Sequence, residues 1–302
     1  MNKIVWFSFF CILLIKTGVA QPNTEILLYK NNPELNRIIE SENKIFDQNG
    51  KITHYSNVSA PRLLIYMPKN PNGMGIIVCP GGGYKRLNVL NTEYIAKRLN
   101  KIGITVFVLV HRLPVDKNVN QDREFVALQD VQTAINMVRF NAGGWNLNPT
   151  QIGLWGSSAG GHLAATATVH HSTSFSKETE GANLCPDFLI LAWPVISFRD
   201  EIVHKGSMIN LLGENPTQKQ IFYFSAEEWV DHSTPPTFLV HASDDTTVPA
   251  ENSIRFYKAL VKNNISAELH IYEKGGHGFG IAPDAGTTWF SELEKWLKNR
   301  RN

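Results

Sequence analysis

Residues 151–170 read QIGLWGSSAGGHLAATATVH, and this stretch decides the fold. A β-rich apolar run over residues 152–155 leads into the pentapeptide GSSAG at 156–160, and an alanine-rich helical run follows. A strand, a sharp turn and a helix in this order are typical of a nucleophile elbow with the pattern G-x-S-x-G. The flanking glycines fit, because a Cβ two residues before or after the serine would collide with the neighbouring strand or helix. Ser158 is therefore the candidate nucleophile.

Partners for this serine follow later in the chain, and they strengthen a pentapeptide that is weak evidence by itself. His277 lies in a glycine-rich loop directly after the predicted strand 268–272, and it is the candidate general base. Asp245, after the predicted strand 237–241, is the candidate acid that orients the imidazole. Asp244 is the alternative, because one residue along a loop changes which carboxylate faces inward.

A glycine-rich loop follows the predicted strand 75–79, with the sequence PGGGY over residues 80–84. A tetrahedral intermediate needs preorganised donors for its negative oxygen. The backbone N–H groups of Gly82 and Gly83, together with that of Ala159, are the candidates for this oxyanion hole. A phosphate-binding loop is disfavoured, because neither G-K-[ST] nor a dinucleotide-binding spacing of glycines accompanies the loop.

Several other side chains have two readings. Tyr84 and Trp193 each follow a predicted strand, so they are candidates for an aromatic wall against a sugar, with ordinary packing as the alternative. His162 is predicted to be a buried, hydrogen-bonded histidine, and His204 to lie in a solvated loop rather than on the substrate. The pair 170–171 lacks a third ligand at zinc spacing, so we expect no metal and no other cofactor.

Strand-like and helix-like segments alternate through most of the chain. The strand-like segments are 51–56, 62–67, 75–79, 104–110, 152–155, 188–193, 237–241 and 268–272. The main helical segments are 91–101, 125–140, 163–169, 249–261 and 285–299. This alternation predicts an α/β fold, a mostly parallel central sheet with helices on both faces. The first two strands are predicted to form a hairpin closed by the turn at residues 57–61.

Two segments stand apart from this alternation. Residues 194–236, between the sixth and seventh predicted strands, are interpreted as a small cap insertion with short helices at 207–212 and 226–230. The first part of the mature chain, residues 21–50, is predicted to pack on the outside as an extension. We expect residues 21–302 to form a single domain, because no linker-like change of composition interrupts them.

Residues 1–20 combine a short basic start, an apolar run and three small residues before a cleavage point. This pattern predicts a cleavable signal peptide and a secreted or periplasmic protein, with a membrane anchor as the alternative. Removal of Lys3 and Lys16 brings the formal net charge from +2 to zero, so we expect no nucleic-acid partner and no membrane association of the mature form. Cys79 and Cys185 alone do not make a disulfide framework.

Four runs of sequence together resemble a known family: CPGGGY, GSSAGGHLA, HASDDTTVP and GGHGFG, in that order. They are similar to the secreted α/β-hydrolase esterases related to acetylxylan esterases, and the likeness extends from about Arg62 onward. The resemblance implies an α/β-hydrolase fold and removal of short acyl groups, chiefly acetyl, from plant-type polysaccharides or their fragments.

The resemblance also assigns roles. It implies that Ser158 is the nucleophile, Asp245 the acid and His277 the base, with the glycine loop as the oxyanion site. Pro80 stands where the HGGG motif of related lipase-type esterases has its histidine, so the hydrogen bonding of this loop is open although its backbone donors are kept.

The expected function is that of a secreted, metal-independent serine esterase that works through an acyl-enzyme on an acetylated carbohydrate or a small ester. A general carboxylesterase or lipase-like hydrolase is the first alternative. A peptidase of the same fold and a non-catalytic carbohydrate-binding relative are the others.

Overall fold

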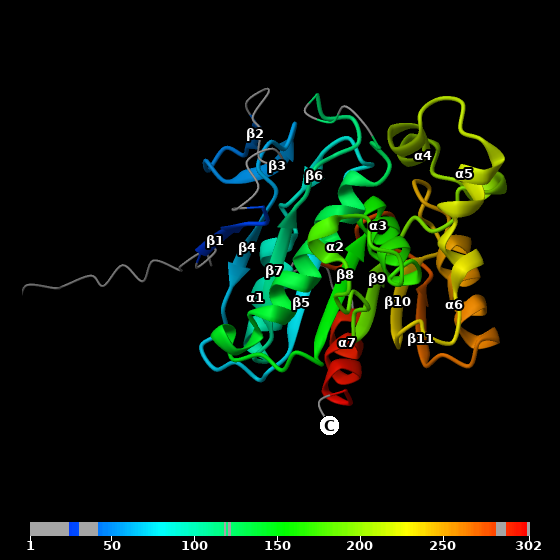
Figure 1. Cartoon of the computed structure of the whole chain (residues 1–302). Coiled ribbons are helices and arrows are strands. Elements are labelled where there is room, and N and C mark those ends of the chain that lie inside the picture. The colour runs from blue at the N-terminus through cyan, green and yellow to red at the C-terminus, as the bar shows by residue number, and fades with distance from the viewer. Residues whose placement is uncertain (1–23, 30–41, 118, 120–121, 282–287, 301–302) are drawn as a thin grey trace, which may run out of the picture.

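The computed structural model describes residues 24–29, 42–117, 119, 122–281 and 288–300 (Figure 1). The predicted signal peptide, residues 1–20, lies outside the described residues, and so does half of the predicted N-terminal extension, residues 21–23 and 30–41. Within the described ranges no helix combines the length and the apolar character needed to cross a membrane.

A twisted eight-stranded sheet forms the centre of the described structure (Figure 1). Its strands, in spatial order, are β1 (Thr24–Leu27), β4 (Arg62–Tyr66), β7 (Thr105–Val110), β5 (Gly75–Cys79), β8 (Ile152–Ser157), β9 (Phe188–Ala192), β10 (Thr237–Ala242) and β11 (Ala267–Tyr272). The pairs β1–β4 and β4–β7 are antiparallel, and all neighbours from β7 to β11 are parallel. The prediction of a mostly parallel sheet is therefore confirmed.

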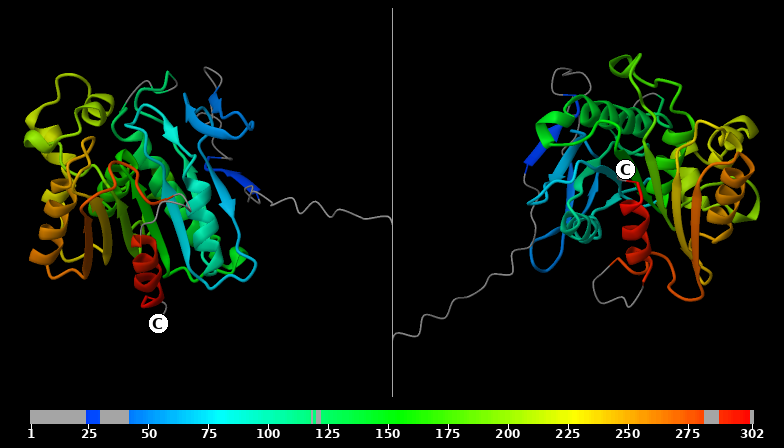
Figure 2. Two further views of the ribbon diagram at one scale, coloured as in Figure 1. Left: turned by 180° about the vertical axis from the view of Figure 1, so that it is seen from behind. Right: turned by 90° about the horizontal axis from the view of Figure 1, so that it is seen from below.

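Helices cover both faces of this sheet, as predicted. One face carries α2 (Val126–Phe140), α3 (Ala159–Val169) and α6 (Glu251–Lys262), which share one hydrophobic cluster with the sheet. The other carries α1 (Thr92–Lys101) and α7 (Trp289–Lys298), which belong to a second cluster and lie in front of the sheet when it is seen from behind (Figure 2). Side chains alternate between the two clusters along each inner strand, because successive residues of a strand point to opposite faces.

The inner strands are buried along their whole length, which explains why they read as continuous apolar runs in the sequence. The elbow helix α3 is buried on nearly every side, and its alanines and glycines let it pack closely on the sheet. By contrast α1 and α7 bury one apolar face each and expose the other.

A second, three-stranded sheet lies beside the first. It shows that the predicted hairpin of residues 51–56 and 62–67 is wrong. It consists of β2 (Asn43–Phe46), β3 (Ile52–Ser56) and β6 (Leu87–Asn88), all antiparallel. The strands predicted to pair with each other, β3 and β4, belong to different sheets. The connection between them is redirected at Asn57, whose φ is 51°, and at Val58, whose N–H donates to Asp116 over 3.0 Å.

The segment predicted as a cap lies between β9 and β10. It contains α4 (Lys205–Leu212), α5 (Gln218–Tyr223) and the 3₁₀ helices η3 (Asp200–Ile202) and η4 (Ala226–Trp229). Two further 3₁₀ helices, η1 (Ala142–Trp145) and η2 (Lys177–Thr179), follow α2 and α3. Asn252 of α6 fixes the start of the cap, because its side chain accepts from the N–H groups of Ile196 and Ser197 and donates to the carbonyl of Ile202.

Candidate active site

The turn between β8 and α3 holds Ser158 in a conformation that is strained for a residue with a side chain. Its φ is 55° and its ψ is −126°. The neighbouring glycines make this turn possible: a Cβ on Gly156 would lie 2.3 Å from the carbonyl oxygen of Gly160, and a Cβ on Gly160 would lie 2.1 Å from that of Cys79. The strand, turn and helix thus project the serine side chain from the carboxyl end of the sheet.

Three side chains that are far apart in the sequence meet at this point. The Oγ of Ser158 lies 2.9 Å from Nε2 of His277, and Nδ1 of the same ring lies 2.7 Å from Oδ2 of Asp245. Both distances are those of hydrogen bonds. In this chain of contacts the imidazole can accept the serine proton on one nitrogen while the carboxylate holds a proton on the other.

Asp245 lies in a site that keeps it ionised. Its Oδ1 accepts hydrogen bonds from the backbone N–H groups of Thr247 and Val248, both 2.9 Å long. Burial would raise the pKa of this carboxyl, but the side-chain contacts with His241 and His277 and the backbone donors outweigh burial and hold the pKa below its usual value. A permanent carboxylate here can stabilise an imidazolium at position 277.

The alternative acid, Asp244, has a different place in the same loop. Its Oδ1 accepts from the backbone N–H of Gly276 over 2.8 Å, so it holds the loop that carries the histidine. The structure therefore brings Asp245 to the imidazole of His277, and Asp244 to the backbone one residue before it.

The carbonyl oxygens of the glycine loop after β5 accept hydrogen bonds that hold the loop in place. The carbonyl of Gly81 accepts from the N–H of Asn88 over 2.7 Å, and that of Gly82 accepts from Lys85 and Arg86. The carbonyl of Gly83 accepts from the side-chain amide of Asn210 in the cap over 2.7 Å. The hydrogen bonding that Pro80 left open is thus supplied by the backbone and by the cap.

The donors of this loop are free. No described residue accepts a hydrogen bond from the backbone N–H of Gly82, Gly83 or Ala159. Gly82 has a φ of 136°, and a Cβ at this position would lie 2.0 Å from the carbonyl oxygen of Arg86, so no other residue fits. Free N–H groups next to a nucleophile can bind an oxyanion.

A cavity of about 450 Å³ opens over Ser158 and His277. The glycine loop, Trp193 and His204 line it near these two residues. Its lining also includes the polar side chains Arg86, Asn88, Asn91, Thr92 and Thr247 and the apolar side chains Val78, Ile95 and Ile281. The cavity has room for a small ester and offers hydrogen-bonding groups around it.

The comparison with protein families agrees with this geometry. The BD-FAE family model matches residues 63–260, about two thirds of the chain. The chain belongs to the BD-FAE family. His277 lies beyond the matched residues, so the contact between this histidine and Ser158 is an observation independent of the match.

Curated relatives of this BD-FAE chain include an acetylxylan esterase from Xylanibacter ruminicola, 37% identical over 250 residues, which are 79% of this chain and 48% of the relative. An endo-1,4-β-xylanase B from Butyrivibrio fibrisolvens is 32% identical over 211 residues, 69% of this chain and 33% of the relative. This chain thus spans about half of the first relative and a third of the second.

Among solved structures, an acetyl ester-xyloside bifunctional hydrolase from Caldicellulosiruptor lactoaceticus matches with a TM-score of 0.76 and 34% identity, over 94% of this chain and 98% of that one. A sugar hydrolase from Lactococcus lactis matches with a TM-score of 0.65 and 28% identity, over 86% and 98% of the two chains. The α/β-hydrolase esterase family and its fold, which the sequence resemblance implied, are confirmed.

The structure changes the reading of the two candidate sugar contacts. Tyr84 is only 3% exposed and does not line the cavity over Ser158, so the prediction that it walls the substrate site is wrong. Its hydroxyl lies 2.8 Å from Nδ1 of His162, whose Nε2 lies 2.7 Å from the carbonyl oxygen of Phe224. His162 is buried and hydrogen-bonded, as predicted. Trp193 does line the cavity, although its side chain is 2% exposed and packs on Phe279.

His204 is a pocket residue that the sequence reading assigned to a solvated loop. It begins α4, and its Nδ1 accepts from the backbone N–H of Ser207 over 3.2 Å. Burial, and then the nearby His277, lower its pKa, so the ring is neutral and carries its proton on Nε2. No described residue pairs with Nε2. The one sequence signal was a serine three residues after a histidine, a weak capping pattern.

The candidate metal pair does not come together with further ligands. In the described ranges no group of three or more histidine, cysteine or acidic side chains is arranged to hold a metal ion. Nε2 of His170 instead lies 3.1 Å from the carbonyl oxygen of Tyr223, and Nε2 of His171 lies 3.0 Å from the hydroxyl of Ser233.

Proposed function

We propose that this chain is a secreted serine esterase that removes acetyl groups from carbohydrates, with xylan or its fragments as the first substrate class to test. The single observation that carries the esterase proposal is the continuous contact from Ser158 through His277 to Asp245 beside three unpaired backbone N–H groups. Nucleophile, base, acid and oxyanion donors are the parts that acyl transfer requires.

In the first half of the reaction, Oγ of Ser158 attacks the carbonyl carbon of the ester, and its proton passes to Nε2 of His277. Asp245 stabilises the imidazolium that results. The N–H groups of Gly82, Gly83 and Ala159 bind the negative oxygen of the tetrahedral intermediate. His277 then gives its proton to the departing sugar oxygen, which leaves an acetylated serine.

In the second half, a water molecule gives a proton to His277 and attacks the acetylated serine. The second tetrahedral intermediate uses the same donors and collapses to acetate, and the proton returns from His277 to Oγ of Ser158. No step of this scheme uses a metal or an organic cofactor.

The carbohydrate part of the proposal draws support from two sources. Relatives that match this chain over most of its length are named as an acetylxylan esterase and as an acetyl ester-xyloside hydrolase. The cavity beside Ser158 also carries polar side chains that can bind the hydroxyl groups of a sugar leaving group. Asn88 and Asn91 among these side chains supply both donors and acceptors.

Secretion is proposed on the sequence of residues 1–20. N-terminal sequencing of protein recovered from an export-competent host tests it. We expect a mature chain that begins near residue 21, and an unprocessed N-terminus on exported protein would contradict cleavage.

The esterase proposal is tested with 4-nitrophenyl acetate, butyrate and octanoate, using wild type and Ser158→Ala. We expect a preference for acetate and a fall in kcat of at least about 10⁴-fold in the variant. Unchanged turnover by the variant would exclude Ser158 as the nucleophile, and a preference for octanoate would favour a lipase-like enzyme. Acetate release from acetylated xylan, mannan and pectin fragments, compared side by side, then tests the substrate class.

A further inference from the structure

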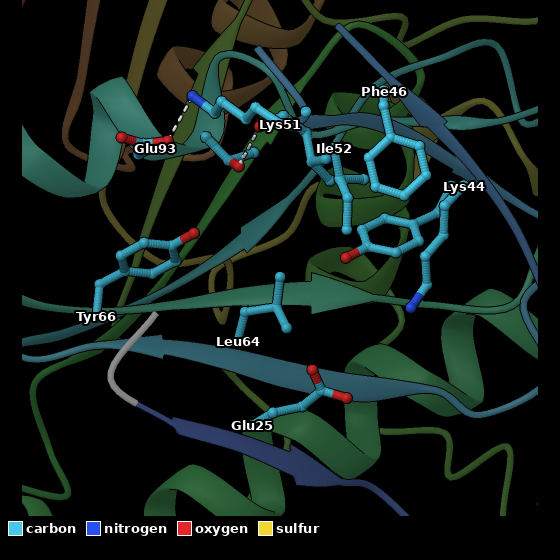
Figure 3. Close-up of a pocket in the computed structure, with 12 residues that line it drawn as sticks. Glu25, Lys44, Phe46, Lys51, Ile52, Leu64, Tyr66 and Glu93 are labelled. Carbon is cyan, nitrogen blue, oxygen red and sulfur yellow. Dashed lines mark hydrogen bonds and ion pairs between the residues drawn. The ribbon is translucent and has the colours of Figure 1, made fainter. Parts of the chain in front are cut away.

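A second cavity of about 290 Å³ adjoins the first. It lies between the small sheet, strand β4 and the start of α1 (Figure 3). Thr92 lines both cavities, with Asn88 and Asn91 on the catalytic side and Val89 on the other. The segment 88–92 therefore lies between two neighbouring hollows.

Aromatic side chains surround this second cavity. Figure 3 shows Phe46 of β2 and Tyr66 of β4 around the opening. Phe46 is 55% exposed, although it belongs to a strand, whereas the lining residues Tyr66 and Tyr55 are only 6% and 4% exposed. The exposed ring of Phe46 can bind the C–H face of a pyranose ring by the same apolar contact that aromatic rings make within proteins.

A hydroxyl donor faces the same space. The side-chain hydroxyl of Tyr66 has no hydrogen-bond partner among the described residues. Burial, followed by the nearby Glu93, raises its pKa, so the group stays neutral. A neutral phenol can both donate to and accept from a sugar hydroxyl.

The charges of the lining are balanced, and this decides the class of ligand. Two acids and two lysines line the cavity, Glu25, Glu93, Lys44 and Lys51. Glu93 forms ion pairs with Lys51, drawn as a dashed line in Figure 3, and with Lys97, while Glu25 pairs with Arg62. Lys44 lies 3.8 Å from Glu42, so each charged residue of the lining has a partner of opposite sign. The combination of rings, a free hydroxyl and paired charges suits a neutral, hydroxyl-rich ligand.

We propose that this cavity is a subsite for sugar units of the same polysaccharide chain whose acetyl ester lies at Ser158. The proposal rests on the proposed function and deepens it, because it makes the preferred substrate an oligosaccharide rather than a single sugar. The chain would run from Ser158 past Asn88 and Asn91 to Phe46 and Tyr66.

The test compares short and long substrates in two variants. Phe46→Ala removes the exposed ring, and Tyr66→Phe removes only the hydroxyl. Phe140→Ala is the matched control, because Phe140 is 87% exposed at the end of α2 and lines neither cavity. The substrates are 4-nitrophenyl acetate, acetylated xylose and acetylated xylo-oligosaccharides, with manno- and galacturono-oligosaccharides in parallel.

For the oligosaccharides we expect each of the two variants to raise KM about fivefold, because a lost stacking or hydrogen-bonding contact has an effect of this order. We expect kcat/KM on 4-nitrophenyl acetate and on the monosaccharide ester to stay at the wild-type value. The control should match wild type on every substrate. Wild-type KM values for both variants on all oligosaccharides would overturn the subsite, and so would an equal loss on 4-nitrophenyl acetate.

A binding measurement separates this proposal from the proposed function. Titration calorimetry of unacetylated oligosaccharides of the three classes into Ser158→Ala needs no catalysis. We expect binding that weakens about fivefold when Phe46→Ala is added. Absence of Ser158-dependent acetate release would refute the esterase and leave this site standing if the binding result holds. Active esterase without any oligosaccharide binding would refute the site alone.

Discussion

Ser158 and the residues in contact with it show how much the site depends on single backbone atoms. The strained turn exists only because Gly156 and Gly160 leave room for carbonyl oxygens that a Cβ would meet at 2.3 Å and 2.1 Å. The position of Ser158 therefore requires that residues 156 and 160 have no Cβ atom. The two glycines of the G-x-S-x-G pattern meet this requirement.

Gly160→Ala should consequently damage both stability and activity. The new Cβ has only backbone atoms of Cys79 and Pro80 as neighbours, so the main chain must move, at a cost of about 2 to 3 kcal/mol. Urea unfolding measures this difference. Gly143→Ala is the control, because a Cβ there meets nothing within 4 Å, and its unfolding midpoint should equal that of wild type. Equal stability of the two variants would contradict the steric account.

Tyr84→Phe tests the buried contact between the glycine loop and the elbow helix. The substitution leaves Nδ1 of His162 without its partner at 2.8 Å, and an unpaired buried group costs about 1 to 3 kcal/mol. We expect the free energy of unfolding to fall by that amount and kcat on 4-nitrophenyl acetate to fall with it, since this loop carries two of the proposed oxyanion donors. A stability equal to wild type would show that water or another group satisfies the imidazole.

The three candidate catalytic residues could be predicted from the sequence for a topological reason. In a parallel sheet the residues after each strand collect at one edge, so Ser158, His277 and an acid near 245 could be selected without coordinates. The choice between Asp244 and Asp245 is close to the limit of such reasoning, because adjacent carboxylates differ only in direction. The two readings of Tyr84, a substrate contact or ordinary packing, could not be separated for a similar reason: the position after a strand does not reveal which way a side chain points.

At the scale of elements, the cap and the glycine loop are joined by one side chain. Asn210 of α4 donates to the carbonyl of Gly83 over 2.7 Å, and its own carbonyl accepts from Arg123 over 2.6 Å. The loop that carries the proposed oxyanion donors Gly82 and Gly83 is thus held from the cap side. His204, at the start of the same helix, faces the cavity.

Asn210→Ala should therefore reduce catalysis more than folding. We expect kcat on 4-nitrophenyl acetate to fall about tenfold, because a displaced oxyanion donor is expensive in the transition state, while the unfolding midpoint changes little. Asn210→Gln, which keeps the amide, should recover part of the rate. A rise in KM of the same size with no change in kcat would indicate a contact with substrate instead of support for the loop.

Most elements could be predicted to within a few residues, and the exceptions have physical causes. Continuous apolar runs predict the inner strands, and periodic apolar residues predict the long helices. Helix α5 was missed, because it buries none of its residues and is stabilised by a capping box between Thr217 and Gln220. Strand β6 has two residues, too few for any period, and the pairing of β3 with β2 and β6 depends on partners that local sequence does not specify.

For the molecule as a whole, buried histidines should make stability depend on pH. Burial lowers the pKa of His162 from 6.5 to about 4 and also lowers the pKa values of His111 and His170. Between pH 6.5 and 4 the unfolded chain binds more protons at position 162 than the folded chain does, so stability is full above pH 6.5 and is lost as the pH falls.

We expect the free energy of unfolding to fall by up to about 1.4 kcal/mol per pH unit for each such histidine in this window. Urea unfolding at several pH values from about 7.5 to about 4.5, a range that includes the reference pKa of histidine, measures how the free energy of unfolding changes with pH. His162→Gln removes one titrating group and should flatten the slope, although its stability at neutral pH is lower. A slope unchanged by this substitution would assign the acid sensitivity elsewhere.

The edge strands of the large sheet, β1 and β11, limit where the chain can be shortened for expression. Expression limits copied from the family match, residues 63–260, would omit β1 and β11, expose the unpaired sides of β4 and β10, and strip α7 from its face. Such a fragment would also lack the imidazole of residue 277. We expect size-exclusion chromatography to show this fragment as aggregate. The folded sheet and the candidate site therefore need residues on both sides of the family match.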